Sequence, residues 1–528
     1  MAKALRNYVN RDIPVSEPLN SRQIANNGGG YSFEVTPKVK LQRFLILGTD
    51  GGTYYTKELD LTKQNVNFIR QIIKDDENLV RETAVEISEA GRAYRNDAAI
   101  FVMALLLAEG KNKAATVEAI NKVVRTGMHV YQLAEFINSL GGWGRAKRTA
   151  IAGWFLSKTP DQLAYQAVKY RQRNGWTMKD LMRLAHPVGV DKGVGNFILG
   201  KSETGPVPMV IAGFAVMQKQ TSVTGVVNCL KVHPNLPWET IPTQFLTDLR
   251  VWKQLFENGQ LKGQALLRNI TRLAKLGAFN DMAFAKKIAD AMRDEEMIRK
   301  TRLHPMQYLN AYVVYTQGQL KADAWNASRQ KGWTTSGIIS DALDDGFGLS
   351  FGNIEPSNKN MMISVDVSGS MSWTAAGTSN FTCAQAAGAM ALVTARVEPK
   401  YMVNGFSGDL VDLNLTARDS IAQAFSKVQK SNFGSTNPSA PLAKAIRENI
   451  PVDTFVIITD NEVNSGSHPA RALKDYRQKT GIPARMVVMG MAANNFSIAD
   501  PLDSGMLDVV GFDTNTPKMV SDFSAGRI

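Results

Sequence analysis

The chain has 528 residues, which is more than one hydrophobic core usually holds, so two or more structural units are expected. Its content of 44% hydrophobic and 21% charged residues is ordinary for a globular protein. Its two cysteines, Cys229 and Cys383, lie far apart and have no neighbouring Cys or His at zinc-binding spacing. Neither a disulfide scaffold nor a zinc site is therefore indicated, and a reducing compartment follows most simply. The amino terminus has no continuous apolar signal segment, and the longest apolar run, residues 98–108, is too short to span a bilayer. We therefore expect a soluble cytoplasmic protein with no membrane partner.

The net charge of +13 is distributed unevenly. Residues 355–528 contain 15 Lys and Arg against 16 Asp and Glu, whereas residues 1–354 contain 46 against 32. The whole positive excess therefore lies in the first two thirds of the chain, which favours a polyanionic partner for that part. Charge alone does not distinguish RNA from DNA or an anionic membrane surface.

The first two thirds of the chain are predicted to be helical beyond an irregular start. Residues 1–60 are rich in turn-forming residues and are expected to be mostly irregular. Apolar residues then recur every three or four positions between short polar breaks, which predicts helices over residues 65–74, 79–90, 98–109, 114–125, 130–140 and 145–156. Short helices joined by short loops stack into an α-solenoid. A compact helical bundle is the alternative that periodicity leaves open.

Basic residues gather over residues 163–186. The periodicity predicts one helix that carries Lys169 and Arg173 on its flank and buries Leu163, Ala167 and Tyr170. Thr177 can N-cap a second helix, which would turn Leu181, Leu184 and Val188 toward the core and project Lys179, Arg183 and His186 outward. Two successive helices would thus present groups that suit phosphates and bases toward one side. The alternative is a solvated helix face.

Further cations flank this stretch. The segment GGWGRAKR contributes Arg145, Lys147 and Arg148, and the later segment ALLRNITRLAKLG contributes Arg268, Arg272 and Lys275. Trp143 and Trp154 could stack on bases, although a Trp beside a helix start more often packs in the core. His304 precedes a proline and predicts a helix boundary rather than a ligand.

A cluster of oxygen ligands follows buried strands in the last third of the chain. The apolar run over residues 361–365 ends in Asp366, and Ser368 and Ser370 follow along a turn. A Gly-containing loop over residues 432–438 carries Thr436, and a second apolar run over residues 454–459 ends in Asp460. This order resembles the metal-ion-dependent adhesion site of von Willebrand factor A domains, and oxygen-only ligands suit a hard divalent cation such as Mg²⁺. The alternative is a Ser-rich turn that caps the next helix.

Strands and helices alternate in this last third. Strands are predicted over residues 361–367, 401–406, 454–459, 486–491 and 507–510, with helices over residues 382–396, 438–449 and 469–479 between them. Such an order is typical of a doubly wound, mostly parallel sheet. Asp366 and Asp460 invite comparison with metal hydrolases, but no second set of metal-binding carboxylates, no Walker loop and no nucleophile–base pair accompanies them. We therefore expect a protein that binds rather than catalyses.

Many longer motifs resemble one family along nearly the whole chain. In order they are PLNSRQIANNGGGY, FLILGTDGGTYYTKE, GGWGRAKRTAIAGW, KYRQRNGWTMKDLMRLAH, ALLRNI, RLHPMQYL, VDVSGSM, IITDNE and IADPLDSGMLDVVGFDT. Together they resemble the Ro ribonucleoprotein autoantigen family, which carries a TROVE domain and has bacterial members. The resemblance implies a ring of HEAT-like helical repeats over residues 1–354, closed by a von Willebrand factor A-like α/β domain over residues 355–528.

The resemblance also implies function. Members of that family bind small noncoding Y RNAs on their outer surface and thread single-stranded 3′ ends of misfolded RNAs through a central hole, as RNA quality-control scaffolds. Lys169, Arg173 and His186 match family positions for outer-surface RNA contact, and Asp366, Ser368, Ser370, Thr436 and Asp460 match the metal site. A partnership with an exoribonuclease such as polynucleotide phosphorylase, tethered by Y RNA, is a further implication, and we expect a monomer.

The family pattern is broken at one place. Its usual Gly-Gly-Thr-Asp loop reads Gly434-Ser435-Thr436-Asn437 here, so the threonine is kept and a negative charge beside it is lost. That loss is expected to weaken cation affinity. The competing hypothesis for the whole chain is a metal-dependent protein–protein adhesion module without an RNA role.

Overall fold

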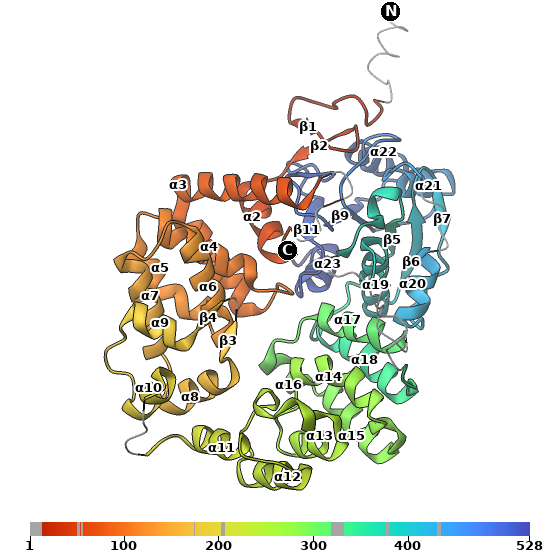
Figure 1. Cartoon of the computed structure of the whole chain (residues 1–528). Coiled ribbons are helices and arrows are strands. Elements are labelled where there is room, and N and C mark those ends of the chain that lie inside the picture. Colours follow the sequence, from red (N-terminus) through yellow and green to blue (C-terminus); the bar gives the residue numbers. More distant parts are fainter. Residues whose placement is uncertain are drawn as a thin grey trace, which may run out of the picture. The chain divides into compact units, whose positions relative to one another are not determined.

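The computed structural model describes residues 13–49, 53, 56–173, 175–201, 206–317, 332–375, 380–429 and 434–528. The chain divides into two compact units (Figure 1). The helical unit spans residues 67–350, and the α/β unit combines residues 1–66 with residues 351–528. The predicted combination of stacked helices and an α/β sheet is confirmed. Ring closure, which depends on the placement of the two units, stays a prediction.

The helical unit is built from short helices that pack on near neighbours in the sequence. Thus α4 packs on α5 and α6, α5 on α7, α7 on α9, α8 on α11, α12 on α13, α14 on α17, and α15 on α18. This local pattern is that of an α-solenoid rather than of a bundle with one shared core. Among the described residues, no helix is both long and apolar enough to cross a membrane. The helices are α4 (Asp97–Glu109), α5 (Lys113–Val123), α6 (Gly127–Ser139), α7 (Arg145–Leu156), α8 (Pro160–Lys169), α9 (Met178–Ala185), α10 (Lys192–Leu199), α11 (Met209–Met217), α12 (Val223–Val232), α13 (Leu249–Glu257), α14 (Gln264–Lys275), α15 (Met282–Arg293), α16 (Glu295–Thr301), α17 (Pro305–Thr316) and α18 (Gly337–Leu349).

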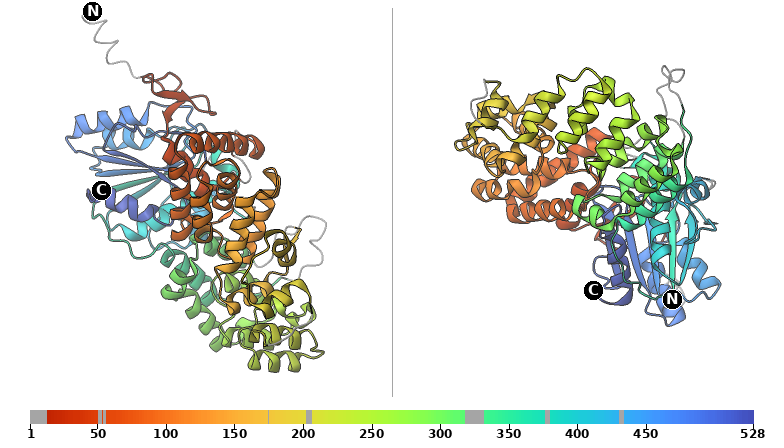
Figure 2. Two further views of the ribbon diagram at one scale, coloured as in Figure 1. Left: turned by 90° about the vertical axis from the view of Figure 1, so that its left-hand side faces the viewer. Right: turned by 90° about the horizontal axis from the view of Figure 1, so that it is seen from below.

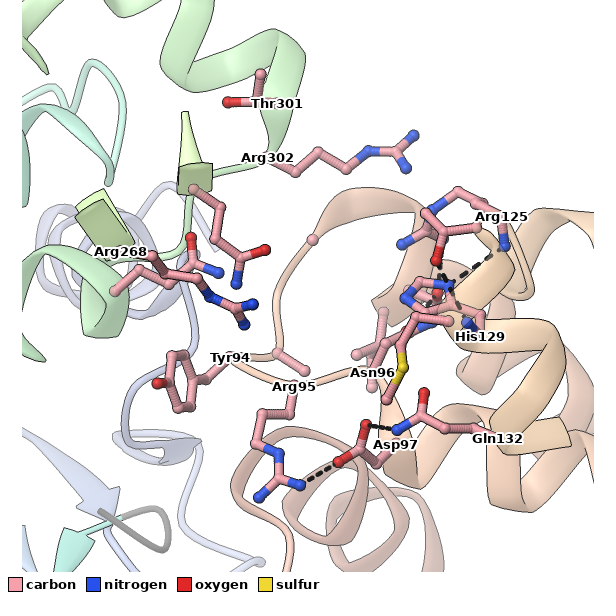
Figure 3. Close-up of a pocket in the computed structure, with 18 of the residues that line it drawn as sticks. Tyr94, Arg95, Asn96, Asp97, Arg125, His129, Gln132, Arg268, Thr301 and Arg302 are labelled. Carbon is pink, nitrogen blue, oxygen red and sulfur yellow. Dashed lines mark hydrogen bonds and ion pairs between the residues drawn. The ribbon is translucent and has the colours of Figure 1, made fainter. Parts of the chain in front are cut away.

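Helix boundaries follow local capping chemistry. Helix α3 (Glu58–Ala90) breaks at Asp76, whose φ of −149° is not helical and whose side chain accepts the backbone N–H of Leu79, so the predicted break between two helices is confirmed. The predicted boundary at His304 is also confirmed, because its Nδ1 accepts the N–H of Met306 at the start of α17. Residues 91–96, which join α3 to α4, border a pocket inside this unit (Figure 3).

The α/β unit contains a six-stranded sheet in the order β11-β9-β8-β5-β6-β7. All neighbours are parallel except β6 and β7, so the predicted mostly parallel sheet is confirmed. The central strands β5 and β8 are buried throughout, as expected when helices cover both faces of the sheet (Figure 2). The strands are β5 (Met361–Asp366), β6 (Tyr401–Phe406), β7 (Leu410–Asp412), β8 (Thr454–Thr459), β9 (Arg485–Gly490) and β11 (Met506–Val510), and the helices are α19 (Cys383–Val397), α20 (Ile421–Gln429), α21 (Ala440–Arg447), α22 (Pro469–Thr480) and α23 (Thr516–Ala525), with a 3₁₀ turn, η5 (Gly369–Ser372).

The amino-terminal segment is ordered against this unit, which corrects the expectation of a mostly irregular start. Strands β1 (Gln23–Ala25) and β2 (Tyr31–Glu34) form a hairpin, and β2 also pairs with β10 (Phe496–Ser497). Helix α2 (Pro37–Leu47) packs on β11. The Gly-rich stretch forms the hairpin loop. The pairing of β2 with β10 joins residues far apart in the sequence, so no local pattern predicts it.

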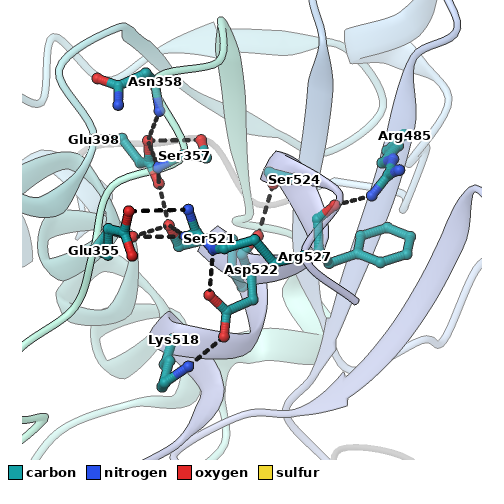
Figure 4. Close-up of polar contacts among 12 residues, drawn as sticks. Glu355, Ser357, Asn358, Glu398, Arg485, Lys518, Ser521, Asp522, Ser524 and Arg527 are labelled. Carbon is teal, nitrogen blue, oxygen red and sulfur yellow. Dashed lines mark hydrogen bonds and ion pairs between the residues drawn. The ribbon is translucent and has the colours of Figure 1, made fainter.

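The buried carboxylate of Glu398 forms hydrogen bonds with both the segment that precedes β5 and the last helix, α23 (Figure 4). Glu398 follows α19 and accepts hydrogen bonds from the backbone N–H of Ser357 at 2.9 and 3.0 Å and from the hydroxyl of Ser521 at 2.9 Å. The guanidinium of Arg527 donates to the backbone carbonyl of Glu355 at 2.9 Å. These contacts hold α23 against the segment that leads into the sheet.

Candidate functional site

The predicted basic stretch forms a helix, a short hairpin and a second helix. Helix α8 ends at Lys169, and Arg173 lies in β3 (Gln172–Arg173), which pairs antiparallel with β4 (Trp176–Thr177). Arg173 is therefore not on the helix that carries Lys169, contrary to the prediction. The Asn-Gly pair is a strong hairpin signal, and Gly175 has a φ of 76° that suits such a turn. Asn174 itself lies outside the described residues.

Helix α9 starts and turns as predicted, but one core assignment is wrong. Thr177 accepts the N–H of Asp180 and the Asp180 carboxylate accepts the N–H of Thr177, which is a capping box. Leu181 is fully buried, whereas Val188 is 89% exposed because α9 ends at Ala185 and the chain turns at His186, which has a φ of 47°. The predicted core position of Val188 is therefore wrong, because the helix ends three residues before it.

The outward basic side chains of this segment differ in their exposure to solvent and in their charged partners. Arg173, Arg183 and His186 are exposed, and Lys179 is half-buried. Lys169 is more enclosed, because its side chain is 21% exposed and its Nζ lies 3.8 Å from Oε1 of Glu239. Its ammonium also lies 5.6 and 5.5 Å from the ring centres of Tyr165 and Tyr170. Among the described residues, Lys179, Arg183, Arg173 and His186 form no ion pair with a carboxylate.

The neighbouring helix α7 presents two of its three predicted cations. Arg145 and Arg148 are exposed. Lys147 is buried, and its Nζ donates to the carbonyl oxygens of Leu140 at 3.2 Å and Gly142 at 2.8 Å. Burial also lowers the pKa of Lys147. This side chain satisfies carbonyls beyond the end of α6, so the expectation that Lys147 faces RNA is corrected.

The predicted metal ligands converge at the carboxyl ends of β5 and β8. Oδ2 of Asp366 accepts the hydroxyl of Thr459 at 2.6 Å, and Oδ1 accepts the N–H of Ser368 at 2.9 Å. The hydroxyl oxygens of Ser368 and Ser370 lie 3.0 Å apart. All three predicted ligands from this turn are buried. Within the described residues, no group of three or more His, Cys, Asp or Glu side chains is arranged to hold a metal, so a site here would depend on hydroxyl ligands.

Asp460 supplies the second buried carboxylate. Its Oδ1 accepts the N–H of Glu462 at 3.0 Å, while its Oδ2 is buried without a hydrogen-bond partner. Burial and the charges of Asp366 and Glu462 raise the pKa of Asp460 well above its usual range, and burial raises the pKa of Asp366. Crowded carboxylates with an orphaned oxygen fit a bound cation, because its positive charge would offset their repulsion.

The loop that carries Thr436 forms hydrogen bonds with the segment after β5 and with the segment after Asp460. The Gly434 carbonyl accepts the N–H of Gly369 at 3.4 Å, and the N–H of Thr436 donates to the Asn464 side chain at 2.8 Å. Asn437 accepts from the Ser439 hydroxyl at 2.6 Å and donates from Nδ2 to the Gly408 carbonyl at 3.2 Å. An aspartate could not make the second bond, so the departure from the family pattern has a local structural use. Residues 432 and 433 of this loop lie outside the described residues.

One element of the candidate metal centre was missed from the sequence. The carboxylate of Glu462 accepts hydrogen bonds from the Asn27 side chain at 2.8 Å and from the N–H of Gly28 at 3.0 Å. The loop of the amino-terminal hairpin thus holds the segment that follows Asp460. The run NNGGG indicated a turn, but nothing local indicated its partner.

Comparisons with known proteins agree with this architecture. A TROVE-domain model matches residues 24–200 and 228–336, and a Ro60 vWA-domain model matches residues 360–524. The chain is 36% identical over 538 residues to RNA-binding protein RO60 of Deinococcus radiodurans, covering 99% of this chain and 98% of that protein. It is 29% identical over 598 residues to RNA-binding protein RO60 of Caenorhabditis elegans, covering 97% and 91%.

A solved structure gives the same result for the fold. The crystal structure of the Deinococcus radiodurans RO (RSR) protein matches with a TM-score of 0.68 and 32% sequence identity, covering 93% of this chain and 100% of that chain. The similarity spans the stacked helices and the sheet alike. With both domain models matched and a relative this similar along its full length, the chain belongs to the Ro60 family of TROVE-domain proteins.

Proposed function

We propose that this protein binds RNA through the exposed cations of α7, the β3–β4 hairpin and α9. The observation that carries the proposal is that Arg173, Arg183 and His186 are exposed and have no carboxylate partner among the described residues. Unpaired guanidinium groups on a chain segment with excess positive charge suit phosphate oxygens. The names of the relatives, RNA-binding protein RO60, support the same choice of partner.

The finer proposal concerns which RNAs are bound. The family resemblance favours small noncoding Y-like RNAs on this basic surface and single-stranded 3′ ends of misfolded RNAs elsewhere on the protein. Phosphate contacts give affinity with little sequence preference, as a quality-control scaffold needs. In this proposal the protein is a cytoplasmic monomer that catalyses nothing itself and presents RNA to an exoribonuclease such as polynucleotide phosphorylase.

We propose further that Asp366, Ser368, Ser370, Thr436 and Asp460 hold a divalent cation, with Mg²⁺ as the best fit to an all-oxygen donor set. The buried, unpartnered Oδ2 of Asp460 supports this assignment. The cation would neutralise the two carboxylates and could offer a position to an acidic group of a partner. That possibility keeps the second candidate function, a metal-dependent protein-adhesion module, in view.

The test of RNA binding compares two variants with the wild-type chain. In the first, Arg173→Gln, Arg183→Gln and His186→Gln are combined, because these three exposed side chains carry the proposal. In the control, Lys474→Gln and Lys479→Gln remove two exposed cations of α22. Both variants lose two formal positive charges at neutral pH. Affinity for a structured small RNA is measured by fluorescence anisotropy across a salt titration.

The proposal expects weaker binding and a salt slope reduced by about 1.4–1.8 for the first variant only, because each of the two lost cationic phosphate contacts removes about 0.7–0.9 from the slope. Equal behaviour of the two variants would reject the surface. Binding of an acidic protein partner that is lost in EDTA, with no RNA bound by the wild-type chain, would favour the adhesion module instead.

A further inference from the structure

Two of the proposed metal ligands are held by one loop. Residues 461–468, which we call the ligand loop, follow Asp460 at the end of β8. The backbone N–H of Glu462 donates to Oδ1 of Asp460 at 3.0 Å. The N–H of Asn464 donates to the Thr436 carbonyl at 3.3 Å, and the Asn464 side chain accepts the N–H of Thr436 at 2.8 Å. The position of the ligand loop therefore influences where Asp460 and Thr436 lie.

The loop of the β1–β2 hairpin contacts the first half of the ligand loop. The Asn27 side chain and the N–H of Gly28 donate to the Glu462 carboxylate at 2.8 and 3.0 Å. Nδ2 of Asn26 donates to the Val463 carbonyl at 3.0 Å. Two of these three donors reach a carboxylate, and hydrogen bonds to a charged acceptor are stronger than those between neutral groups. The hairpin loop thus fixes the two residues that come second and third after Asp460.

The segment around β1 contacts the second half of the ligand loop. The N–H of Val15 donates to the Gly466 carbonyl at 2.9 Å. The imidazole of His468 is buried, and its Nε2 lies 2.8 Å from the Glu17 carbonyl oxygen while its Nδ1 lies 3.2 Å from Nε2 of Gln23. The amino-terminal segment therefore supports the ligand loop at both of its ends.

Helix α2 reaches Asp460 by a second route. Nη1 of Arg43 donates to the side-chain oxygen of Asn494 at 2.8 Å, and Nδ2 of Asn494 donates to the backbone carbonyl of Asp460 at 2.5 Å. The Arg43 side chain is completely buried, so this chain of hydrogen bonds is shielded from water. Two separate parts of the amino-terminal segment, the hairpin and α2, thus converge on the residue that carries one proposed ligand.

The turn directly after Asp460 is supported from outside the ligand loop. Asn461 has a φ of 65°, in the left-handed region that costs free energy for residues other than glycine, although asparagine tolerates it better than most. Oδ1 of Asn461 accepts the N–H of Ile498 at 3.1 Å, and the Ser32 hydroxyl of β2 donates to the Asn461 carbonyl at 3.5 Å. The hairpin therefore helps to maintain a turn that is less favourable than extended backbone.

We infer that the amino-terminal segment sets the cation affinity of the candidate metal centre, with Asn27 and Arg43 as positioning residues for Asp460. The inference rests on the metal centre proposed above. Residues that hold metal ligands in place commonly change metal affinity by about 10–100-fold although they do not touch the metal. Because coupling between two binding events is reciprocal, a cation that needs the docked hairpin must also hold the hairpin in place. Displacement of the hairpin would therefore release the cation.

The test uses the full chain and two variants of the hairpin loop, neither of which is a proposed metal ligand. Gly30→Ala separates the hairpin from the ligand loop, because a Cβ at this position would overlap the Val463 carbonyl oxygen. Asn27→Ala removes one donor to the ligand loop from an exposed position. The matched control is Asn20→Ala, since this side chain accepts the backbone N–H two residues along instead of contacting the ligand loop. Melting temperatures across a Mg²⁺ titration give the half-saturating concentration for each chain.

The half-saturating Mg²⁺ concentration is expected to rise by about tenfold in Gly30→Ala, to rise less in Asn27→Ala, and to stay unchanged in Asn20→Ala. If Gly30→Ala does not fold, Asn27→Ala decides, because its exposed side chain can be shortened without opening the core. A wild-type value in Asn27→Ala and in folded Gly30→Ala would overturn the inference. An equal rise in Asn20→Ala would also overturn it, because contacts to the ligand loop would then not be the cause.

Hydrogen exchange measures the reciprocal effect, which a purely structural hairpin would not show. In the wild-type chain, Mg²⁺ at about 100 times its dissociation constant should slow exchange of the amides of residues 15–31 by up to about 100-fold relative to EDTA. Asp460→Asn should show no such difference. Equal exchange with and without Mg²⁺, in a wild-type chain whose melting temperature Mg²⁺ raises, would overturn this inference and leave the metal centre standing. If Mg²⁺ does not raise that melting temperature, the metal centre itself fails and the inference with it.

Discussion

Nη2 of Arg43 lies 2.7 and 2.8 Å from the two carboxylate oxygens of Asp508, and the Arg43 side chain is completely buried. The same guanidinium donates to the Asn494 side chain at 2.8 Å and to the Phe496 carbonyl at 2.7 Å. A single arginine on α2 thus ties the amino-terminal segment to the edge strand of the sheet. Because the guanidinium is fully buried, its charge is compensated by these partners rather than by water.

Replacing Arg43 should therefore destabilise the α/β unit strongly. Arg43→Met is expected to reduce the free energy of unfolding by about 3–5 kcal/mol, since Asp508 would keep a buried charge without its partner. Hydrogen exchange at the amides of β9 and β11 measures the effect. The double variant Arg43→Met with Asp508→Leu should recover part of the loss. A single variant as stable as the wild-type chain would show that the pair contributes nothing.

Lys147 and Arg148 should separate stability from RNA binding, although they are adjacent. Lys147→Met is expected to lower the stability of the helical unit by about 1–2 kcal/mol, because two carbonyls near the end of α6 lose their donor. RNA affinity should not change. Arg148→Gln is expected to weaken RNA binding modestly and leave the melting temperature unchanged. Calorimetric melting and fluorescence anisotropy on both variants test this. Weaker RNA binding by Lys147→Met, or a lower melting temperature for Arg148→Gln, would contradict the assigned roles.

The candidate metal centre predicts that the Asp460→Asn variant is at least as stable as the wild-type chain without a cation and less stable than it when Mg²⁺ is bound. Asp460→Asn removes one of the buried charges that repel each other, so in EDTA the variant should melt at the same or a higher temperature than the wild-type chain. Adding Mg²⁺ should raise the melting temperature of the wild-type chain only, because a ligand that binds the folded state stabilises it. A variant that is stabilised by Mg²⁺ as much as the wild-type chain would argue against Asp460 as a ligand.

His129 predicts an acid-sensitive helical unit. Burial and the charge of Arg125 lower its pKa from 6.5 to about 4. Because the unfolded chain then binds the proton more readily, stability should fall as the pH drops from about 6.5 to about 4, by up to about 3 kcal/mol. Melting curves across that range, compared with those of His129→Gln, test this. The stability of His129→Gln should not show this decrease with falling pH. An equal decrease in the variant and in the wild-type chain would contradict the prediction.

Local signals made much of the architecture predictable. The buried run of β5 that ends in Asp366, the cap at Thr177 and the boundary at His304 each depend on residues a few positions apart, and all three were read correctly. The position of Arg173 was predicted wrongly, because the helical periodicity that places it on the helix of Lys169 competes with the hairpin signal of the Asn-Gly pair that follows it.

Other features could not be read from the sequence at all. Lys147 looks like any other cation in a basic run, and only the backbone geometry shows that its ammonium turns inward to carbonyls. The contact between Glu462 and the hairpin loop joins residues 434 positions apart. The cations that line the pocket of Figure 3, namely Arg95, Arg125, Arg268, Lys300 and Arg302, come from four separate segments, so their convergence depends on tertiary packing alone.

The amino-terminal hairpin and helix also set an order for folding during synthesis. Arg43 cannot form its ion pair until Asp508, 465 positions later, has been synthesised, and β2 cannot pair before β10 is present. As the nascent chain leaves the ribosome, the stacked helices can consolidate pair by pair, while the first segment remains unsatisfied until the final strands emerge. Limited proteolysis of a released chain truncated just before β10, compared with one that ends just after β11, should therefore find this segment protected only in the longer chain.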